Sequence, residues 1–304
     1  MSLWEISVLL NLRSWVDDEN DTSRIHFRQA VHILLMAIAG DPTLSSMMIM
    51  KGGVLLAIRY GSDRFTKDVD FSTQRTLRDS ELQAYLDTLR TALKSVSYEN
   101  EYDLSLELQS HQLKPKSEES HYPTLQMKVG YARKSDRGAM RRLAGGQASD
   151  VVAIDYSFNE WASDIEEQSL ENGTISMYPF HDLVAEKLRS VLQQVVRNRS
   201  RFQDIYDLGL LFDSCNIGID DRSEILGKLI KASSERDLEV HKRSMDSEEL
   251  RQRSRARYHE LEALIGHEPP PFEAAYERVM AFFVSLPWDE HLTPDLEASA
   301  TELR

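Results

Sequence analysis

The stretch KGGVLLAIRYGSDRFTKDVDFS, residues 51–72, changes its periodicity halfway along and constrains the fold more than any other segment. A glycine pair precedes apolar residues at helical spacing that stop at Gly61, a residue type common just after a helix. In KDVDFS the period becomes two, so Asp68 and Asp70 share one face of a predicted strand. This order is unusual for a purely structural segment and indicates a site.

The regions on both sides predict a mixed sheet followed by helices. The strand over residues 150–158 carries Asp155 in phase with Val151, Ala153 and Ser157, on the face opposite Val152, Ile154, Tyr156 and Phe158. We expect a loop at the basic residues 133–142 and an acidic separating segment over 159–178, with a turn at Asn172-Gly173. The other predicted elements are helices over 24–39, 52–60, 77–96, 179–196 and 202–213, paired strands over 103–113 and 124–132, and a last helix after Pro271.

Length and composition favour an ordinary globular protein with two lobes. The 304 residues, 41% hydrophobic and 28% charged, predict lobes at 1–175 and 176–304. No apolar run reaches about 18 residues, and the N-terminus lacks a cleavage signal, so we expect a cytoplasmic protein without a membrane partner. The single Cys215 excludes an internal disulfide and a cysteine-based metal site.

The net charge of −14 argues against a protein that coats nucleic acid through bulk electrostatics. Local basic patches remain candidates for RNA contacts, and each could equally be a solvated face. The candidate RNA-binding residues are Arg133, Lys134, Arg137, Arg141, Arg142, Arg199 and Arg201.

Two carboxylates at positions i and i+2 of a strand can converge on one cation or bridge a pair. Their Cα atoms lie about 6 to 7 Å apart. Mg²⁺ suits such oxygen ligands, especially where substrate phosphates complete the shell. Asp68 and Asp70, with Asp155 from a neighbouring strand, would form a two-metal site for displacement at phosphorus. The general base would be Asp155 or a water.

The glycine pair then has a chemical reason. Gly52 and Gly53 precede a helix, and unobstructed backbone N–H groups at a helix N-terminus bind phosphate oxygens. Lys51 and Arg64 flank this corner as candidate phosphate charges, and Lys187 is a third if the helical lobe folds back. A nucleoside triphosphate is the ligand that such a cradle predicts.

This order resembles the polymerase-beta-like nucleotidyltransferases and, more narrowly, the AbiEii/AbiGii-type toxins that include the MenT toxins. The motifs that carry the resemblance are Lys51-Gly52-Gly53, VLLAIRYG, Arg64-Phe65-Thr66, Asp68-Val69-Asp70-Phe71, Glu186-Lys187-Leu188 and Gln203-Asp204-Ile205-Tyr206-Asp207-Leu208. The match spans roughly residues 45–72 and 150–210. One departure is Gln203, which stands where the family usually has arginine; Arg199 or Arg201 could substitute in space.

The resemblance implies a role for individual residues. Asp68 and Asp70 would bind metal, Lys51 and Thr66 would line the nucleotide pocket, and Lys187 would contact the triphosphate. Asp204 or Asp207 would orient that lysine or help catalysis. The family also implies tRNA as the acceptor and a separate antitoxin protein in a toxin-antitoxin or phage-defence system.

Three functions follow as alternatives on an α+β nucleotidyltransferase lobe, a mixed sheet with flanking helices, joined to a helical C-terminal lobe. The first is transfer of a nucleoside monophosphate (NMP) from a nucleoside triphosphate (NTP) to an RNA end, which predicts a basic surface beside Asp68 and Asp70. The second is transfer to a protein hydroxyl, and the third is a non-catalytic nucleotide-sensing module. Retention of all three carboxylates argues against the third, because carboxylates held together without a cation repel each other.

Overall fold

The computed structural model describes residues 10–76, 78–115 and 122–291. Contacts between Cα atoms divide the chain into two compact units, Met1–Pro179 and Phe180–Arg304. The lobe boundary expected near residue 176 falls within the last strand of the first unit. The assignment of two independent domains stays a prediction.

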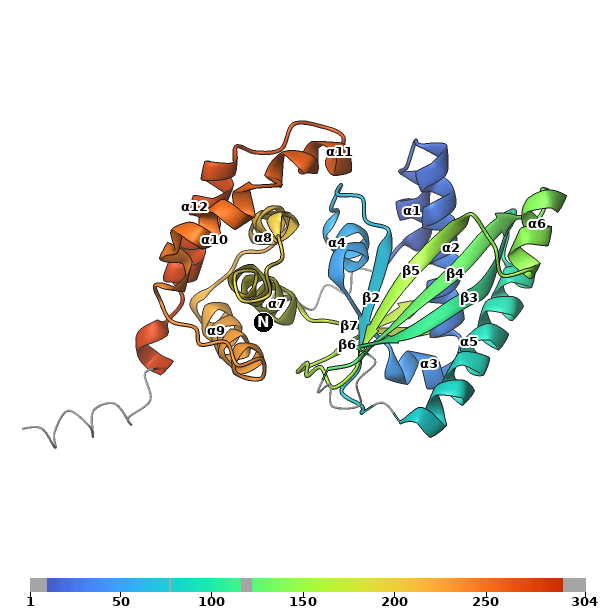
Figure 1. Cartoon of the computed structure of the whole chain (residues 1–304), viewed down its shortest axis with the longest axis horizontal. Helices are drawn as coiled ribbons and strands as arrows, with labels where there is room; N and C mark the ends of the chain where they lie inside the picture. The colour runs from blue at the N-terminus through green and yellow to red at the C-terminus, as the bar shows by residue number, and fades with distance from the viewer. Residues whose placement is uncertain (1–9, 77, 116–121, 292–304) are drawn as a thin grey trace, which may run out of the picture. The chain divides into compact units, whose positions relative to one another are not determined.

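The first unit holds all the strands of the described residues, arranged as one seven-stranded mixed sheet (Figure 1). Its elements in chain order are α1 (Leu12–Asp17), α2 (Thr22–Ala39), α3 (Pro42–Met47), β1 (Ile49–Lys51), α4 (Gly52–Tyr60), β2 (Asp68–Ser72), α5 (Asp79–Glu99), β3 (Leu104–Lys114), β4 (Thr124–Arg133), α6 (Arg137–Ala144), β5 (Asp150–Ser157), β6 (Glu166–Leu170) and β7 (Gly173–Met177). The strand order is β3-β4-β5-β2-β1-β7-β6, in which β2 and β5 are parallel, as are β1 and β7. The α+β class predicted from the sequence is confirmed.

One face of the sheet forms the core of this unit against α2 and α5. Val69 and Phe71 of β2 are fully buried on that face, and Tyr156 of β5 stacks on Tyr85 of α5 with ring centroids 5.5 Å apart. Because side chains alternate along a strand, Asp68 and Asp70 point to the opposite face. Burial of the apolar residues therefore fixes which way the carboxylates point.

The prediction of a basic loop over residues 133–142 is wrong, since most of this segment is the helix α6. Asp136 caps that helix, and its carboxylate accepts a hydrogen bond of 2.9 Å from the backbone N–H of Ala139. An aspartate at this position satisfies an N–H group that the helix itself cannot pair. The high charge of the segment concealed this capping signal.

Residues 159–178, predicted as an acidic separating segment with one turn, hold more regular structure than expected. They contain the hairpin β6–β7, and β7 pairs in parallel with β1 and so belongs to the sheet. The hairpin turn is Glu171–Asn172, one residue earlier than expected. β1 has only three residues, too few to show a strand period in the sequence.

The second unit is helical in its described part, as predicted. Its elements are α7 (Phe180–Gln193), α8 (Phe202–Ser214), α9 (Ile219–Ser234), η2 (Ser244–Asp246), α10 (Glu248–Arg255), η3 (Tyr258–Glu260), α11 (Leu261–Ile265), α12 (Phe272–Val284) and η4 (Trp288–His291). Lys228 of α9 forms a buried ion pair with Asp182 of α7 at 2.6 Å. Across both units, no helix in the described ranges is sufficiently long and apolar to cross a bilayer.

Gly173 provides a stability test of the β6–β7 turn. A Cβ atom at this position would lie 1.9 Å from the carbonyl oxygen of Ala39, at the end of α2. We therefore expect Gly173→Ala to lower the free energy of unfolding by about 1–3 kcal/mol, as overpacking does. Urea unfolding followed by circular dichroism measures this change.

Gly138→Ala is the matched control, because a Cβ there meets only ordinary contacts at 3.4 Å or more. It should leave stability unchanged or raise it by up to about 1 kcal/mol, since alanine favours a helix. Equal destabilisation by both substitutions would contradict the tight packing of the turn on α2.

Candidate active site

Four polar residues lie side by side across four strands of the sheet. The strand register pairs Lys51 of β1 with Asp70 of β2, Asp70 with Asp155 of β5, and Asp155 with Gln126 of β4. Neighbouring strands are about 4.8 Å apart, so each side chain in this row is adjacent to the next. Gln126 donates a 3.0 Å hydrogen bond to the carboxylate of Asp155. The predicted convergence of Asp70 and Asp155 is therefore built into the backbone pairing.

Asp68 lies at the start of β2, two residues before Asp70, and is the more exposed residue of the two, although its carboxyl group is partly shielded from solvent. Burial of its carboxyl group and the negative charge of Asp155 raise the pKa of Asp68, against the opposing effect of Lys67. A pKa raised by a second carboxylate shows that the two negative charges act on each other. A cation bound between them would remove this repulsion.

Gly52 allows the close approach of Asp70 to the N-terminus of α4. Its φ of 74° lies in the left-handed region, and a Cβ there would lie 2.0 Å from an Asp70 carboxylate oxygen. Only glycine fits both the conformation and the contact. The corner thus brings a carboxylate to the first turn of a helix, where backbone N–H groups also favour anions.

Arg64 and Thr66 meet the second glycine of the pair. A Cβ on Gly53 would lie 3.0 Å from a guanidinium nitrogen of Arg64 and 3.0 Å from the methyl carbon of Thr66. The intervening Phe65 packs edge to face on Phe27 of α2, with centroids 5.3 Å apart, and so anchors the loop. Both predicted pocket residues are therefore held at the start of α4.

Lys51 is buried, and its ammonium group forms an ion pair with Glu160. The ammonium nitrogen also lies 5.4 Å from the ring centroid of Tyr178. Sequence reasoning missed Glu160, which follows β5 in an irregular segment where no periodicity marks it. Gln126 was also missed, although its polar side chain on a largely apolar strand was a usable signal.

The donor set fits Mg²⁺ better than a metal held by protein ligands alone. In the part of the chain that the structure describes, no three His, Cys, Asp or Glu side chains are placed to hold one ion. Mg²⁺ is usually bound by one or two carboxylates with waters and substrate phosphates. Asp68 and Asp70 can supply those carboxylates, while Asp155 is engaged with Gln126.

In the second unit, Lys187 of α7 lies between two aspartates of α8. Its ammonium nitrogen is 2.6 Å from Asp207 and 3.0 Å from Asp204, and all three side chains are buried. The second carboxylate oxygen of Asp204 is buried without a hydrogen-bond partner among the described residues. The two aspartates therefore fix the position of the lysine ammonium group, and the charges sum to one excess negative charge.

Comparison with known proteins assigns the family. Residues 33–278 match the family described as nucleotidyl transferase AbiEii toxin, type IV toxin-antitoxin system. The chain belongs to this family. The toxin is thus a nucleotidyltransferase of a type IV toxin-antitoxin system, with a nucleotide substrate and an antitoxin partner, as the sequence motifs predicted.

Two solved structures from Helicobacter pylori are similar to the toxin in fold. JHP933 has 14% identity and a TM-score of 0.48, covering 94% of this chain and 98% of that one. A second protein, assigned as a nucleotidyltransferase, has 13% identity and a TM-score of 0.46, covering 87% and 94%. No curated protein sequence matches.

The candidate RNA-binding residues of the first unit, Arg133 to Arg142, do not line the row of carboxylates. Arg133 lies seven positions beyond Gln126 on β4, about 23 Å away at the usual strand rise. Lys134 and the arginines of α6 follow Arg133 and are all exposed. Only an acceptor much longer than a mononucleotide could contact both regions.

The second unit gathers five arginines around the end of α7. Burial, followed by the charges of Arg236, Arg189, Arg199 and Arg201, lowers the pKa of Arg197. Arg189 is buried, and the other four arginines form a local positive surface despite the acidic total charge. Such a surface attracts phosphates.

The buried lysine gives a second stability test. Asp207 is fully buried and makes the shorter contact with Lys187, so Asp207→Asn should lower the free energy of unfolding by about 1.5–3 kcal/mol, because Lys187 loses its closer charged partner and keeps only Asp204. Asp204→Asn should destabilise the protein clearly less. Lys187 keeps its closer carboxylate, Asp207, in this variant, and the Asp204 oxygen that is buried without a partner no longer carries negative charge. Urea unfolding of both variants measures the order, and a reversed order would contradict these roles.

Proposed function

We propose that the toxin uses Asp68 and Asp70 with Mg²⁺ to transfer an NMP from an NTP to an RNA acceptor, the 3′ end of tRNA. The observation that carries the proposal is the cross-strand row of Lys51, Asp70 and Asp155 at the glycine corner of α4. It combines metal-binding oxygens, a lysine on the neighbouring strand and the N–H groups at the start of a helix.

In this reaction the acceptor hydroxyl oxygen forms a bond to the α-phosphorus of the NTP. The bond from that phosphorus to the oxygen bridging to the β-phosphate breaks, and pyrophosphate leaves with the electron pair. The hydroxyl proton passes to the Asp155 carboxylate or to a water. When bound, Mg²⁺ supplies positive charge for the phosphate oxygens.

The chain's own residues do the positioning. Arg64, whose guanidinium lies beside Gly53, supplies one positive charge for the phosphates. Lys51, which forms an ion pair with Glu160, supplies a second. Thr66 borders the same glycine and would contact the nucleotide. In the second unit, Lys187, held by Asp204 and Asp207, is a further candidate for contact with phosphate.

The arginines around Arg197 favour RNA as the acceptor. A polynucleotide carries a phosphate at each step, and clustered guanidiniums bind such a chain with strong salt dependence. Arg199 and Arg201 belong to this cluster, while Arg133 and α6 offer a second, separate basic surface. A protein acceptor would need neither.

The test is label transfer from each α-labelled NTP, with Mg²⁺, total tRNA and cell protein offered together. Label on tRNA that is lost after removal of the 3′ nucleotide is the expected result. Label on protein alone would move the acceptor to a protein hydroxyl, and absence of label from every acceptor would contradict the proposed transfer.

Asp68→Asn and Asp70→Asn should each lower the transfer rate at least about a hundredfold, because each removes a metal-binding charge. Their free energy of unfolding should stay at or above that of the wild type, since loss of a repelling carboxylate does not weaken the core. Asp63→Asn, an exposed carboxylate outside the row, is the matched control. If Asp68→Asn or Asp70→Asn keeps full activity, the substituted aspartate does not belong to the active site.

Arg197→Ala combined with Arg199→Ala should raise KM for tRNA at least about fivefold, with little change in kcat. The slope of log KM against log salt should decrease by about two, one for each lost phosphate contact. Arg243→Ala, which removes an exposed arginine paired with Asp246, is the control. An unchanged salt slope in the double variant would contradict RNA binding at this surface.

A further inference from the structure

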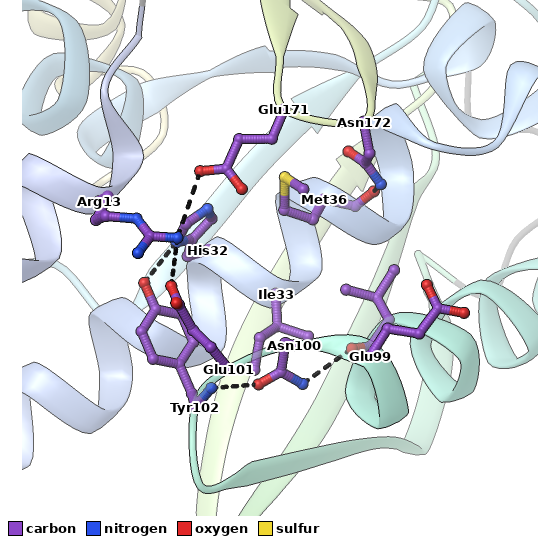
Figure 2. Close-up of a pocket in the computed structure, with 11 residues that line it drawn as sticks. Arg13, His32, Ile33, Met36, Glu99, Asn100, Glu101, Tyr102, Glu171 and Asn172 are labelled. Atoms are coloured by element: carbon purple, nitrogen blue, oxygen red, sulfur yellow. Dashed lines mark hydrogen bonds and ion pairs between the residues drawn. The ribbon is translucent and has the colours of Figure 1, made fainter.

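A cavity with a volume of about 390 Å³ lies in the first unit among α1, α2, the end of α5 and the β6–β7 turn (Figure 2). Ile33 and Met36 of α2 and Val96 of α5 give it an apolar wall. None of its lining residues belongs to the row of carboxylates or to the glycine corner. The cavity therefore needs its own explanation.

His32 lies in the wall of this cavity and is only 4% exposed. Its Nδ1 atom is 2.8 Å from the hydroxyl oxygen of Tyr102. Among the described residues no hydrogen bond is made by Nε2, and His32 is one of the residues that line the cavity. Figure 2 shows the imidazole beside Arg13 with Glu171 above it.

The imidazole and the phenol are both neutral near pH 7. Burial lowers the pKa of His32 and outweighs the nearby charges of Glu171 and Glu101, which raise it. Burial also raises the pKa of Tyr102 to about 12. A neutral imidazole whose Nδ1–H donates to Tyr102 presents Nε2 as an acceptor, so a donor on the ligand selects this tautomer.

The rim of the cavity is negatively charged. Three carboxylates, Glu99, Glu101 and Glu171, and one cation, Arg13, line the cavity, so these four side chains carry a net charge of −2. Arg13 forms an ion pair with Glu101, while Glu171 is 4.0 Å from the guanidinium. A further positive charge bound at the rim would therefore reduce its net negative charge.

Glu171 is held in place by the turn that contains it. The side-chain amide of Asn172 donates a 2.9 Å hydrogen bond to the carbonyl of Met36 on α2. The close contact of Gly173 with Ala39 fixes the other end of the turn. A carboxylate on such an anchored turn is preorganised, which lowers the entropy cost of binding.

We propose that this cavity binds a protonated alkylamine. The methylene chain lies on Ile33 and Met36, and the ammonium group donates to Nε2 of His32 and to the carboxylate of Glu171. The source is either a free diamine or polyamine or a lysine side chain of another protein, because both present the same ammonium group on an aliphatic stem. The cavity exceeds the size of a bare inorganic cation, and the apolar wall favours an organic one.

Titration of the full chain with putrescine at constant ionic strength tests this, with calorimetry and the ¹⁵N resonance of His32 Nε2 as readouts. Saturable binding of one equivalent with a shift of that resonance is expected. A parallel titration with Nα-acetyl-lysine amide identifies the source. If this compound binds and the diamine does not, the ligand is a lysine side chain. If the diamine binds, the ligand is a free amine.

Glu171→Gln should weaken the binding at least about fivefold, which is the effect of losing one half-exposed charge partner. Tyr102→Phe, which removes the hydroxyl that holds Nδ1, should also weaken it. Glu81→Gln, on the exposed side of α5, is the matched control and should bind as the wild type does. Lack of a saturable Nε2 shift with both compounds, or wild-type affinity in Glu171→Gln, would overturn the proposal.

Discussion

The contact between Gly52 and Asp70 is the constraint on which the candidate active site depends. Its left-handed backbone and the missing Cβ let α4 begin directly beside the carboxylate of β2. The strand register, in which β2 lies between β1 and β5, places Lys51 and Asp155 next to Asp70 at the same corner. A larger residue at position 52 would separate the helix N-terminus from the carboxylates, and phosphate and metal could then no longer share one corner.

Much of this corner could be predicted because its signals are local. The change of period between residues 60 and 68 predicted the helix and the strand, and alternation on β5 predicted the face of Asp155. Partners distant in sequence left no such signal. Glu160 contacts Lys51 across 109 positions, and only the folded structure shows this ion pair. Likewise, α6 was missed because its cap, Asp136, was interpreted as one acid in a basic loop.

The two basic regions show why total charge is a poor guide to partners. The net charge of −14 argues against nucleic-acid binding, yet Arg197 lies in the field of four other arginines. Acidic residues elsewhere keep bulk attraction low, so an RNA would be held only where phosphates meet clustered guanidiniums. In the same way, the acidic rim of the cavity near His32 is a local negative surface and would attract a cation. The protein thus has local surfaces of positive and of negative charge, which suits an enzyme that binds several small or polyanionic ligands.

The central claim is that Asp68 and Asp70 hold the metal that binds the nucleotide. Electron paramagnetic resonance of Mn²⁺, titrated into the toxin with a non-hydrolysable NTP, tests it most directly. The account predicts that Mn²⁺ binding tightens when the nucleotide is added, with coupling to its phosphorus nuclei, and that Asp70→Asn loses both effects. Equal Mn²⁺ and nucleotide binding in wild type and Asp70→Asn would contradict it.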